Sequence, residues 1–247
     1  RIFSHSLTIP QQMKQFFSAT GLFGSAARTL FCLFFLLAIA VPQVQASHNM
    51  AADLTYTHLG GNQYRFLLTV YRDCSGITAS GSWTLRIRSA TCAINTTITL
   101  TQTAGPSGSS GTEVSQLCGA ATSTCAGGTN PGVQVYYYTG TYTLPCQAAD
   151  WIFSSQECCR NTSTNLTGAT GYDLYVQATL NNTTINNNSP TFANLPVPYV
   201  CAGQQVQYSN NAVDADGDSL VYSLVQPHDD AGVYVPYSGG FTPTSPM

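Results

Sequence analysis

The chain has 247 residues, of which only 8% are charged and 43% are hydrophobic, a length that suits one large domain or two smaller ones. Soluble domains usually carry about 25% charged residues. With 8 basic and 11 acidic residues the chain has no basic surplus to neutralise phosphates, which excludes a nucleic-acid binder, and its hydrophobic content excludes a disordered tail. Beyond Ala46 it contains five arginines, eleven acidic residues and no lysine, so a Schiff-base or P-loop lysine is excluded there.

The first 46 residues are typical of a secretory signal peptide. Met13 is the expected start, Lys14 and Arg28 supply the positive region, and an apolar run over 30–41 precedes a small-residue cleavage site that ends at Ala46. A transmembrane anchor is the alternative, but this run has about 12 residues and a membrane span needs about 20. We therefore expect a signal peptide region at 1–46 and a secreted mature chain without a membrane span.

Apolar and polar residues alternate through most of the chain after residue 50, with the period of two that half-buried strands show. Clusters of glycine, asparagine, serine and proline separate these runs, and none of the runs has the 3.6-residue period of a helix. The expected strands lie within 64–71, 83–88, 94–100, 133–137 and 172–180. This pattern predicts an all-β fold built of immunoglobulin-like β-sandwich modules.

Eight cysteines remain once Cys32 is removed with the signal peptide: Cys74, Cys92, Cys118, Cys125, Cys146, Cys158, Cys159 and Cys201. An even number in an exported chain predicts disulfides, and hence a disulfide-stabilised fold. Cys118 and Cys125 could close a local loop, whereas a bridge between the adjacent Cys158 and Cys159 would be strained, so each of these two is expected to pair with a distant partner. Zinc is the alternative, but none of the spacings is CxxC and no histidine lies near them.

The composition changes over 181–189, where a run of Asn, Thr and Ser predicts a linker or a long turn. Residues 47–188 are therefore expected to form a cysteine-rich β-sandwich domain. Alternating residues over 192–199, 206–208 and 220–224 predict strands of a second domain. Because only 57 residues follow Pro190, we expect 189–247 to be the start of a truncated immunoglobulin- or cadherin-like domain in a longer protein.

The sequence contains no motif for nucleophilic, zinc-protease or nucleotide chemistry, so we expect neither an enzyme nor catalytic residues. Its one concentrated group of acids is Asp214, Asp216 and Asp218. Carboxylates at i, i+2 and i+4 can converge on a calcium ion where the backbone turns, and Gly217 relaxes that turn. Calcium is therefore the expected cofactor, with these three aspartates as its ligands. The alternative is a plain turn held by aspartate side chains, with the carboxylates in solvent.

Six segments carry a recognisable pattern: Leu54-Thr55-Tyr56, 63–66, 69–76, 151–161 with Cys158-Cys159-Arg160-Asn161 at its end, 190–192 and 195–203. Together they resemble the N-terminal module of secreted gliding-motility-associated or PKD-domain surface proteins of gliding Gram-negative bacteria. Asp214 through Leu224 is similar to the acidic motif of dystroglycan-type cadherin-like domains. The resemblance implies signal-peptide export and, in many relatives, type IX secretion with a C-terminal sorting domain. It supplies no catalytic residues.

These features predict a non-catalytic secreted protein of the cell surface, the N-terminal part of a larger adhesin or gliding-motility-associated protein. Surface glycans or proteins, and downstream domains of the same chain, are the expected partners. The alternative is a set of accessory or carbohydrate-binding modules of a secreted hydrolase whose catalytic domain lies downstream. A carbohydrate-binding surface made of Tyr136 and Tyr138 would need an exposed aromatic row, whereas we expect the stretch 136–138 to be core plus edge.

Overall fold

The computed structural model describes residues 49–117, 119–196, 199, 205, 207–209 and 211–246. The expected signal peptide at 1–46 lies outside these residues, as do Cys118 and Cys201. All described residues belong to one compact unit, Gln45–Met247. This part of the chain holds no helix that is long and apolar enough to cross a membrane.

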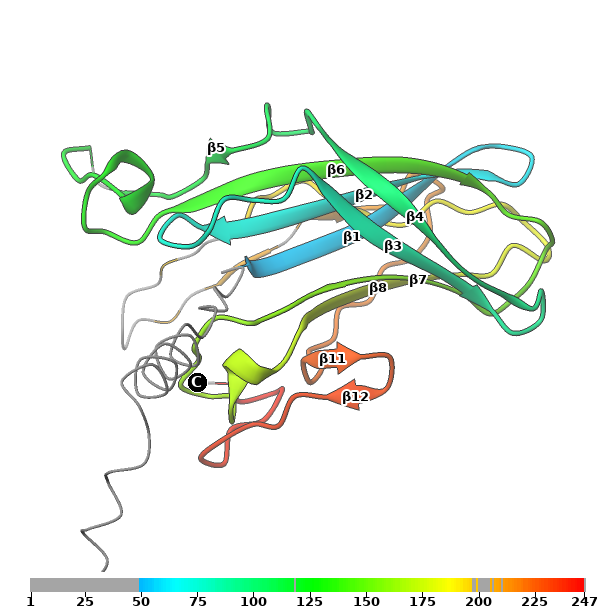
Figure 1. Ribbon diagram of the computed structural model, residues 1–247. Coiled ribbons are helices and arrows are strands. Elements are labelled where there is room, and N and C mark those ends of the chain that lie inside the picture. The colour runs from blue at the N-terminus through cyan, green and yellow to red at the C-terminus, as the bar shows by residue number, and fades with distance from the viewer. Residues whose placement is uncertain are drawn as a thin grey trace, which may run out of the picture. The chain divides into compact units, whose positions relative to one another are not determined.

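Eight described strands form one antiparallel sheet (Figure 1). They are β1 (Asn49–Gly60), β2 (Gln63–Asp73), β3 (Ser82–Ser89), β4 (Ile94–Thr103), β5 (Thr112–Glu113), β6 (Val133–Thr143), β7 (Trp151–Glu157) and β8 (Leu174–Leu180). Their order in the sheet is β1-β2-β6-β4-β3-β7-β8, and β5 pairs with β6. The all-β fold predicted from the alternation of apolar and polar residues is therefore confirmed.

The sheet folds over on itself, so that two layers enclose a common core in a sandwich-like arrangement. β1, β2 and β6 form one layer, and they connect to the layer of β4, β3, β7 and β8 through a short pairing at Thr101–Thr103 of β4. Phe66 of β2 and Phe153 of β7 are fully buried and meet across the core with ring centroids 4.6 Å apart. Aromatic burial of this kind supplies much of the apolar area that stabilises a fold.

The segment 181–189 closes the seam between β1 and β8, the two ends of the strand order. The Tyr56 hydroxyl donates a hydrogen bond to the Thr179 carbonyl of β8 over 2.9 Å. Ser189 binds the other side of Tyr56, since its backbone N–H donates to the Tyr56 carbonyl at 3.0 Å and its hydroxyl accepts from the Tyr56 N–H at 2.7 Å. Asn182 is fully buried and exchanges hydrogen bonds with Ala148. The run predicted to be a linker or a long turn is thus bound to the rest of the fold near its two ends, while residues 183–186 between them are exposed.

A second apolar cluster lies on the outer face of the β2–β6 layer. It contains Tyr71, Val133, Val135 and Tyr137, with Leu195 packed against it. Gly105 lies against the Tyr137 ring, so close that a Cβ on this glycine would sit 2.1 Å from the ring. The loop that contains Gly105 therefore covers this face of the sheet.

Three disulfides join the described cysteines. Cys74–Cys125 ties the end of β2 to the short 3-10 helix η3 (Thr124–Ala126), so the predicted local loop between Cys118 and Cys125 is wrong. Cys92–Cys146 ties the β3–β4 turn to the chain that leads into β7. The expectation of distant partners for Cys158 and Cys159 is also wrong, because they bond to each other across a cis peptide bond that brings their Cα atoms to 3.1 Å.

Two short strand pairs follow the main sheet. They are β9 (Thr191–Phe192) with β10 (Ala212–Val213), and β11 (His228–Asp230) with β12 (Val233–Tyr234). The second pair packs on β8 through His228, whose ring stacks on that of Tyr175 at 6.1 Å and 11°. The strand predicted at 220–224 is wrong: these residues are irregular and Val221 is 91% exposed, because no described strand pairs with them. The domain boundary expected between 188 and 189 stays a prediction.

Candidate functional site

The aspartates singled out by the sequence form a tight turn after β10. One oxygen of Asp214, Oδ1, accepts hydrogen bonds from the backbone N–H groups of Asp216 at 2.9 Å and Asp218 at 3.1 Å. Gly217 has a φ of 83°, in the left-handed region that glycine adopts without strain. The backbone turns here and wraps around the Asp214 side chain as in an Asx turn, while calcium binding by these aspartates stays a prediction.

Asn188 connects the acidic turn to the main sheet. Asp216 accepts from the Asn188 backbone N–H at 2.7 Å and from its side-chain amide at 2.9 Å. The Asn188 Oδ1 in turn accepts from the His58 N–H of β1 at 2.8 Å. Burial, together with the nearby Tyr64 hydroxyl and the charges of Asp214 and Asp216, raises the pKa of Tyr56 to about 12. The acidic turn therefore lies beside the β1 edge and is held there by a side chain of the segment 181–189.

The hydrogen bonds of this turn engage the carboxylates of Asp214 and Asp216 with backbone and amide donors. In the part of the chain that the structure describes, no three His, Cys, Asp or Glu side chains gather as a metal-holding group. Carboxylate oxygens are nevertheless the ligand type that calcium prefers. The turn thus offers the right chemistry, arranged here as a hydrogen-bonded turn.

The tyrosines at 136–138 do not form an exposed aromatic row. Tyr138 is fully buried in the main core and its hydroxyl donates to the Ser80 carbonyl at 2.7 Å. Tyr137 is 2% exposed and belongs to the outer cluster, while Tyr136 packs partly against the main core. Tyr138 confirms the core part of the prediction for this stretch, and its full burial rules out a glycan-binding platform made of Tyr136 and Tyr138. The edge part is wrong, because β6 pairs with β2 on one side and with β4 on the other.

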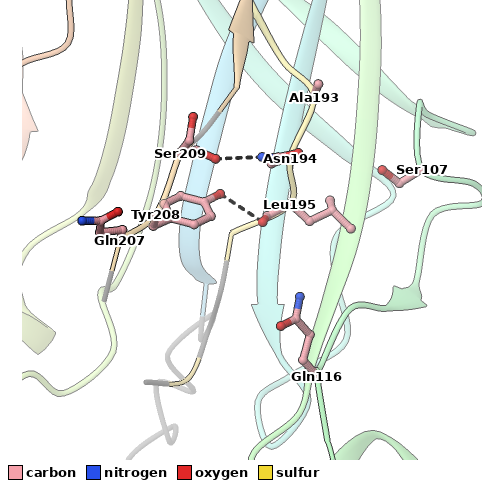
Figure 2. Close-up of a pocket in the computed structure, with 8 residues that line it drawn as sticks. All are labelled: Ser107, Gln116, Ala193, Asn194, Leu195, Gln207, Tyr208 and Ser209. Atoms are coloured by element: carbon pink, nitrogen blue, oxygen red, sulfur yellow. Dashed lines mark hydrogen bonds between the residues drawn. The ribbon is translucent and has the colours of Figure 1, made fainter. Parts of the chain in front are cut away.

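A groove of about 560 Å³ lies between segments 193–195 and 207–209 and the loop residues Ser107 and Gln116 (Figure 2). Two hydrogen bonds join its walls, from the Asn194 side-chain amide to the Ser209 carbonyl at 2.8 Å and from the Tyr208 hydroxyl to the Leu195 carbonyl at 3.0 Å. None of the residues that line this groove is charged. The sequence did not predict this groove, because its lining residues come from four separate places in the chain.

A second groove, of about 520 Å³, lies on the outer face of β3 and β4. Five polar residues of this outer face form what we call the arginine strip: Arg86 and Arg88 of β3 with Asn95, Thr97 and Thr99 of β4. Arg86, Arg88 and Asn95 line the groove, as do Ser89 and Asp150. The β3–β4 register places Arg86 opposite Thr97 and Arg88 opposite Asn95. The alternation of Arg86 and Arg88 with Trp83, Leu85 and Ile87 indicated this outer face from the sequence, but it gave no sign that the two arginines border a groove.

Comparison with protein-family models, with curated proteins and with solved structures finds no match for this chain.

Proposed function

We propose that this chain is a non-catalytic, exported module of an adhesive cell-surface protein. The observation that carries the proposal is the set of three disulfides, Cys74–Cys125, Cys92–Cys146 and Cys158–Cys159, in an all-β fold. Disulfides form and persist in oxidising compartments, outside the cytosol. Export through the signal peptide expected at 1–46 would place the chain in such a compartment.

The position of the disulfides supports a role in which the module withstands mechanical force. Cys74–Cys125 and Cys92–Cys146 join residues 51 and 54 positions apart in the chain. The first ties the end of β2 to η3, and the second ties the β3–β4 turn to the chain between β6 and β7. In the chain-entropy model, loops of this length stabilise a fold by about 4 kcal/mol each. A module closed in this way resists separation of its strands, which suits a protein that joins a cell to a surface.

A more specific hypothesis is that the protein is associated with gliding motility. It rests on the resemblance of segments 54–76, 151–161 and 190–203 to gliding-motility-associated surface proteins. Calcium belongs to it as well: we propose that Asp214, Asp216 and Asp218 bind the ion and stiffen the turn beside β1. An ion there would take over oxygens that now accept hydrogen bonds from Asp218 and Asn188. Its binding would thus be read out as a change in the stability of this turn.

Localisation tests the proposal directly. Intact cells that make the protein are treated with protease, and the chain is then mapped by mass spectrometry without reduction. We expect cleavage of the chain on intact cells and peptides joined through Cys74–Cys125 and Cys92–Cys146. A protected, fully reduced chain inside the cell would overturn the proposal. Beads coated with the oxidised chain should also adhere to the surface on which the cells move or settle, and reduced chain is the control.

The alternative, a carbohydrate-binding module that serves a secreted hydrolase, is favoured by one observation, the arginine strip on β3 and β4. An adhesive module and a hydrolase accessory module can bind the same glycan. They differ in what the longer protein contains, so the complete open reading frame separates them. A hydrolase domain in that frame would support the alternative, and further β-sandwich repeats would support the adhesin.

A further inference from the structure

The arginines that the structure describes differ in their surroundings. Arg72 holds the fold, because its guanidinium donates to the Gln134 side chain at 2.9 Å and to the Gly76 carbonyl at 2.5 Å. Arg160 does the same where it donates to the His228 carbonyl at 2.7 Å. Arg86 and Arg88 instead lie two residues apart on the outer face of β3, so their side chains point to the same side of the sheet.

Neither guanidinium of the arginine strip is paired with a carboxylate in the described hydrogen bonds. Arg86 donates through Nε to the Asn95 side-chain oxygen at 2.9 Å. Arg88 makes one long contact, from Nη2 to the Tyr175 hydroxyl at 3.5 Å, and its Nε is buried without an acceptor. A guanidinium has five N–H donors, held in a fixed planar fork, and a buried donor without a partner costs free energy. The donors left for an anion are the Nη groups of Arg86 and Nη1 of Arg88, because the described hydrogen bonds of these residues use only Nε of Arg86 and Nη2 of Arg88.

Asp150 is the one acidic residue that lines this groove. Its Oδ1 accepts from the Ser89 hydroxyl at 2.6 Å and its Oδ2 from the Thr91 N–H at 3.0 Å, so both oxygens serve the β3–β4 turn. These hydrogen bonds lower the pKa of Asp150, which keeps it ionised. The Cys92–Cys146 disulfide fixes the same turn. The turn beside the groove is therefore held by a disulfide and two hydrogen bonds, and both oxygens of the Asp150 carboxylate already accept hydrogen bonds from it.

The strand beside the arginines presents hydroxyl and amide groups. Asn95, Thr97 and Thr99 are exposed on β4, where they lie opposite Arg88, Arg86 and Thr84. A guanidinium offers a planar pair of N–H groups that matches a carboxylate or a sulfate. Threonine and asparagine side chains can donate to and accept from sugar hydroxyls. The combination fits an anionic sugar chain laid along the strands.

We propose that the arginine strip binds the carboxylate or sulfate groups of an acidic polysaccharide. The proposal rests on the adhesive function proposed above and names the ligand class of that function. Arg86 and Arg88 bind the anionic groups, while Asn95 and Thr97 contact the neighbouring hydroxyls. Ile152 of β7 lines the apolar side of the groove, where the face of a sugar ring can rest.

Calorimetric titration of the full chain with three glycans tests the assignment. The probes are oligogalacturonate for carboxylates, heparin oligosaccharide for sulfates and dextran as the neutral chain. We expect binding to at least one acidic glycan and none to dextran, and the preferred acid identifies the anionic group. The double substitution Arg86→Gln/Arg88→Gln should weaken binding by about tenfold or more, because hydrogen bonds to charged groups are lost.

Arg65→Gln is the matched control, since Arg65 is exposed on β2 and its loss changes the net charge by the same unit as one strip substitution. Arg86→Gln alone covers the case in which loss of Arg88 disturbs folding, which circular dichroism would reveal. The assignment is overturned if neither acidic glycan binds, or if Arg65→Gln weakens binding as much as Arg86→Gln. Adhesion of coated beads in the absence of glycan binding would overturn the ligand class and leave the adhesive function standing.

Discussion

Tyr137 and Tyr138 face opposite sides of β6, and their hydroxyls differ in hydrogen bonding. The Tyr138 hydroxyl donates to the Ser80 carbonyl, whereas the Tyr137 hydroxyl is buried without a partner. A buried polar group without a hydrogen bond lowers the stability of the folded state, and removing the group relieves part of this penalty. Tyr137→Phe should therefore leave the free energy of unfolding unchanged or raise it by up to about 1 kcal/mol, while Tyr138→Phe should lower it by about 1 kcal/mol. Urea denaturation of the two variants measures the difference, and equal losses would contradict it.

Asp53 on β1 makes the stability of the fold depend on pH. Burial raises its pKa above the ordinary value of 3.8, although the Tyr71 hydroxyl partly offsets this by a hydrogen bond to the carboxylate. The folded state thus holds this proton more tightly than the unfolded state, so protonation of Asp53 favours folding. The contribution of Asp53 to stability falls as the pH rises from below 3.8 through the folded-state pKa, and stays low at neutral pH.

Asp53→Asn should therefore stabilise the protein at pH 7, because asparagine keeps an acceptor for Tyr71 and carries no charge. The gain over the parent chain should shrink as the pH is lowered towards 3.8 and vanish below it. Unfolding free energies of the two proteins, measured at matched pH values, test this. A gain that grows on acidification would show that the sign is wrong.

At the scale of elements, the alternation of apolar and polar residues predicted the strands whose two faces differ. β2 is the clearest case, with Tyr64, Phe66 and Leu68 fully buried on one face and Arg65 exposed on the other. β7 lacked this signal, since Ser154 and Ser155 are buried at positions where the sequence suggested no core. The Ser155 hydroxyl donates to the Thr84 carbonyl, a partner 71 residues away. Burial of such polar residues depends on tertiary hydrogen bonds, which local periodicity does not encode.

The candidate sites were predictable only where one short segment supplied all the residues. The acidic turn at 214–218 met this condition, and its backbone geometry followed from Gly217. The arginine strip did not, because Asn95 comes from the next strand and the groove also needs Ile152 of β7. The segment 181–189 was mispredicted for a related reason. Its asparagines suggested a linker, yet Asn182 and Asn188 use their amide groups for tertiary hydrogen bonds.

The loop over the outer face of β6 depends on the absence of a side chain at Gly105. A Cβ at this position would lie 2.1 Å from Cγ of Tyr137, well inside van der Waals contact. Gly105→Ala must therefore displace the loop or the ring, and we expect a loss of about 1–3 kcal/mol in the free energy of unfolding, as for other overpacked sites. Gly81→Ala is the control, because nothing lies within 4 Å of its Cβ position, and it should change stability by less than about 0.5 kcal/mol. Equal losses in thermal or urea denaturation would contradict the close packing of Gly105.

At the scale of the whole molecule, charged residues are few, and acidic residues outnumber basic ones after residue 48. After residue 48 the sequence carries eleven acidic residues against five arginines, and three of the acids lie within 214–218. The arginine strip and the acidic turn are therefore two separate sites of opposite charge. An anionic group could neutralise the first, and a cation could neutralise the second. Salt should weaken glycan binding at the strip, since screening acts on exposed charges. At the acidic turn, the relevant ion is a divalent cation.

Calcium binding at the acidic turn should raise the melting temperature of the chain. Calcium sites of extracellular modules have dissociation constants of about 0.1–1 mM, so 10 mM calcium would stabilise the folded state by about 1.4–2.7 kcal/mol. For a domain of this size that corresponds to a rise of about 3–10 °C. The hydrogen bonds of Asp216 with Asn188 would carry the effect to β1.

Differential scanning calorimetry in calcium, in magnesium and in chelator measures this shift. Asp218→Asn removes one carboxylate and spares the oxygens of Asp214 and Asp216 that hold the turn, so it should abolish the calcium response and leave the melt in chelator unchanged. Asp230→Asn, on β11, changes the net charge equally and should keep the response. Identical melts in calcium and in chelator would assign 214–218 to a hydrogen-bonded turn alone, and a response of equal size to magnesium would indicate screening of clustered charge instead of a coordinated calcium ion.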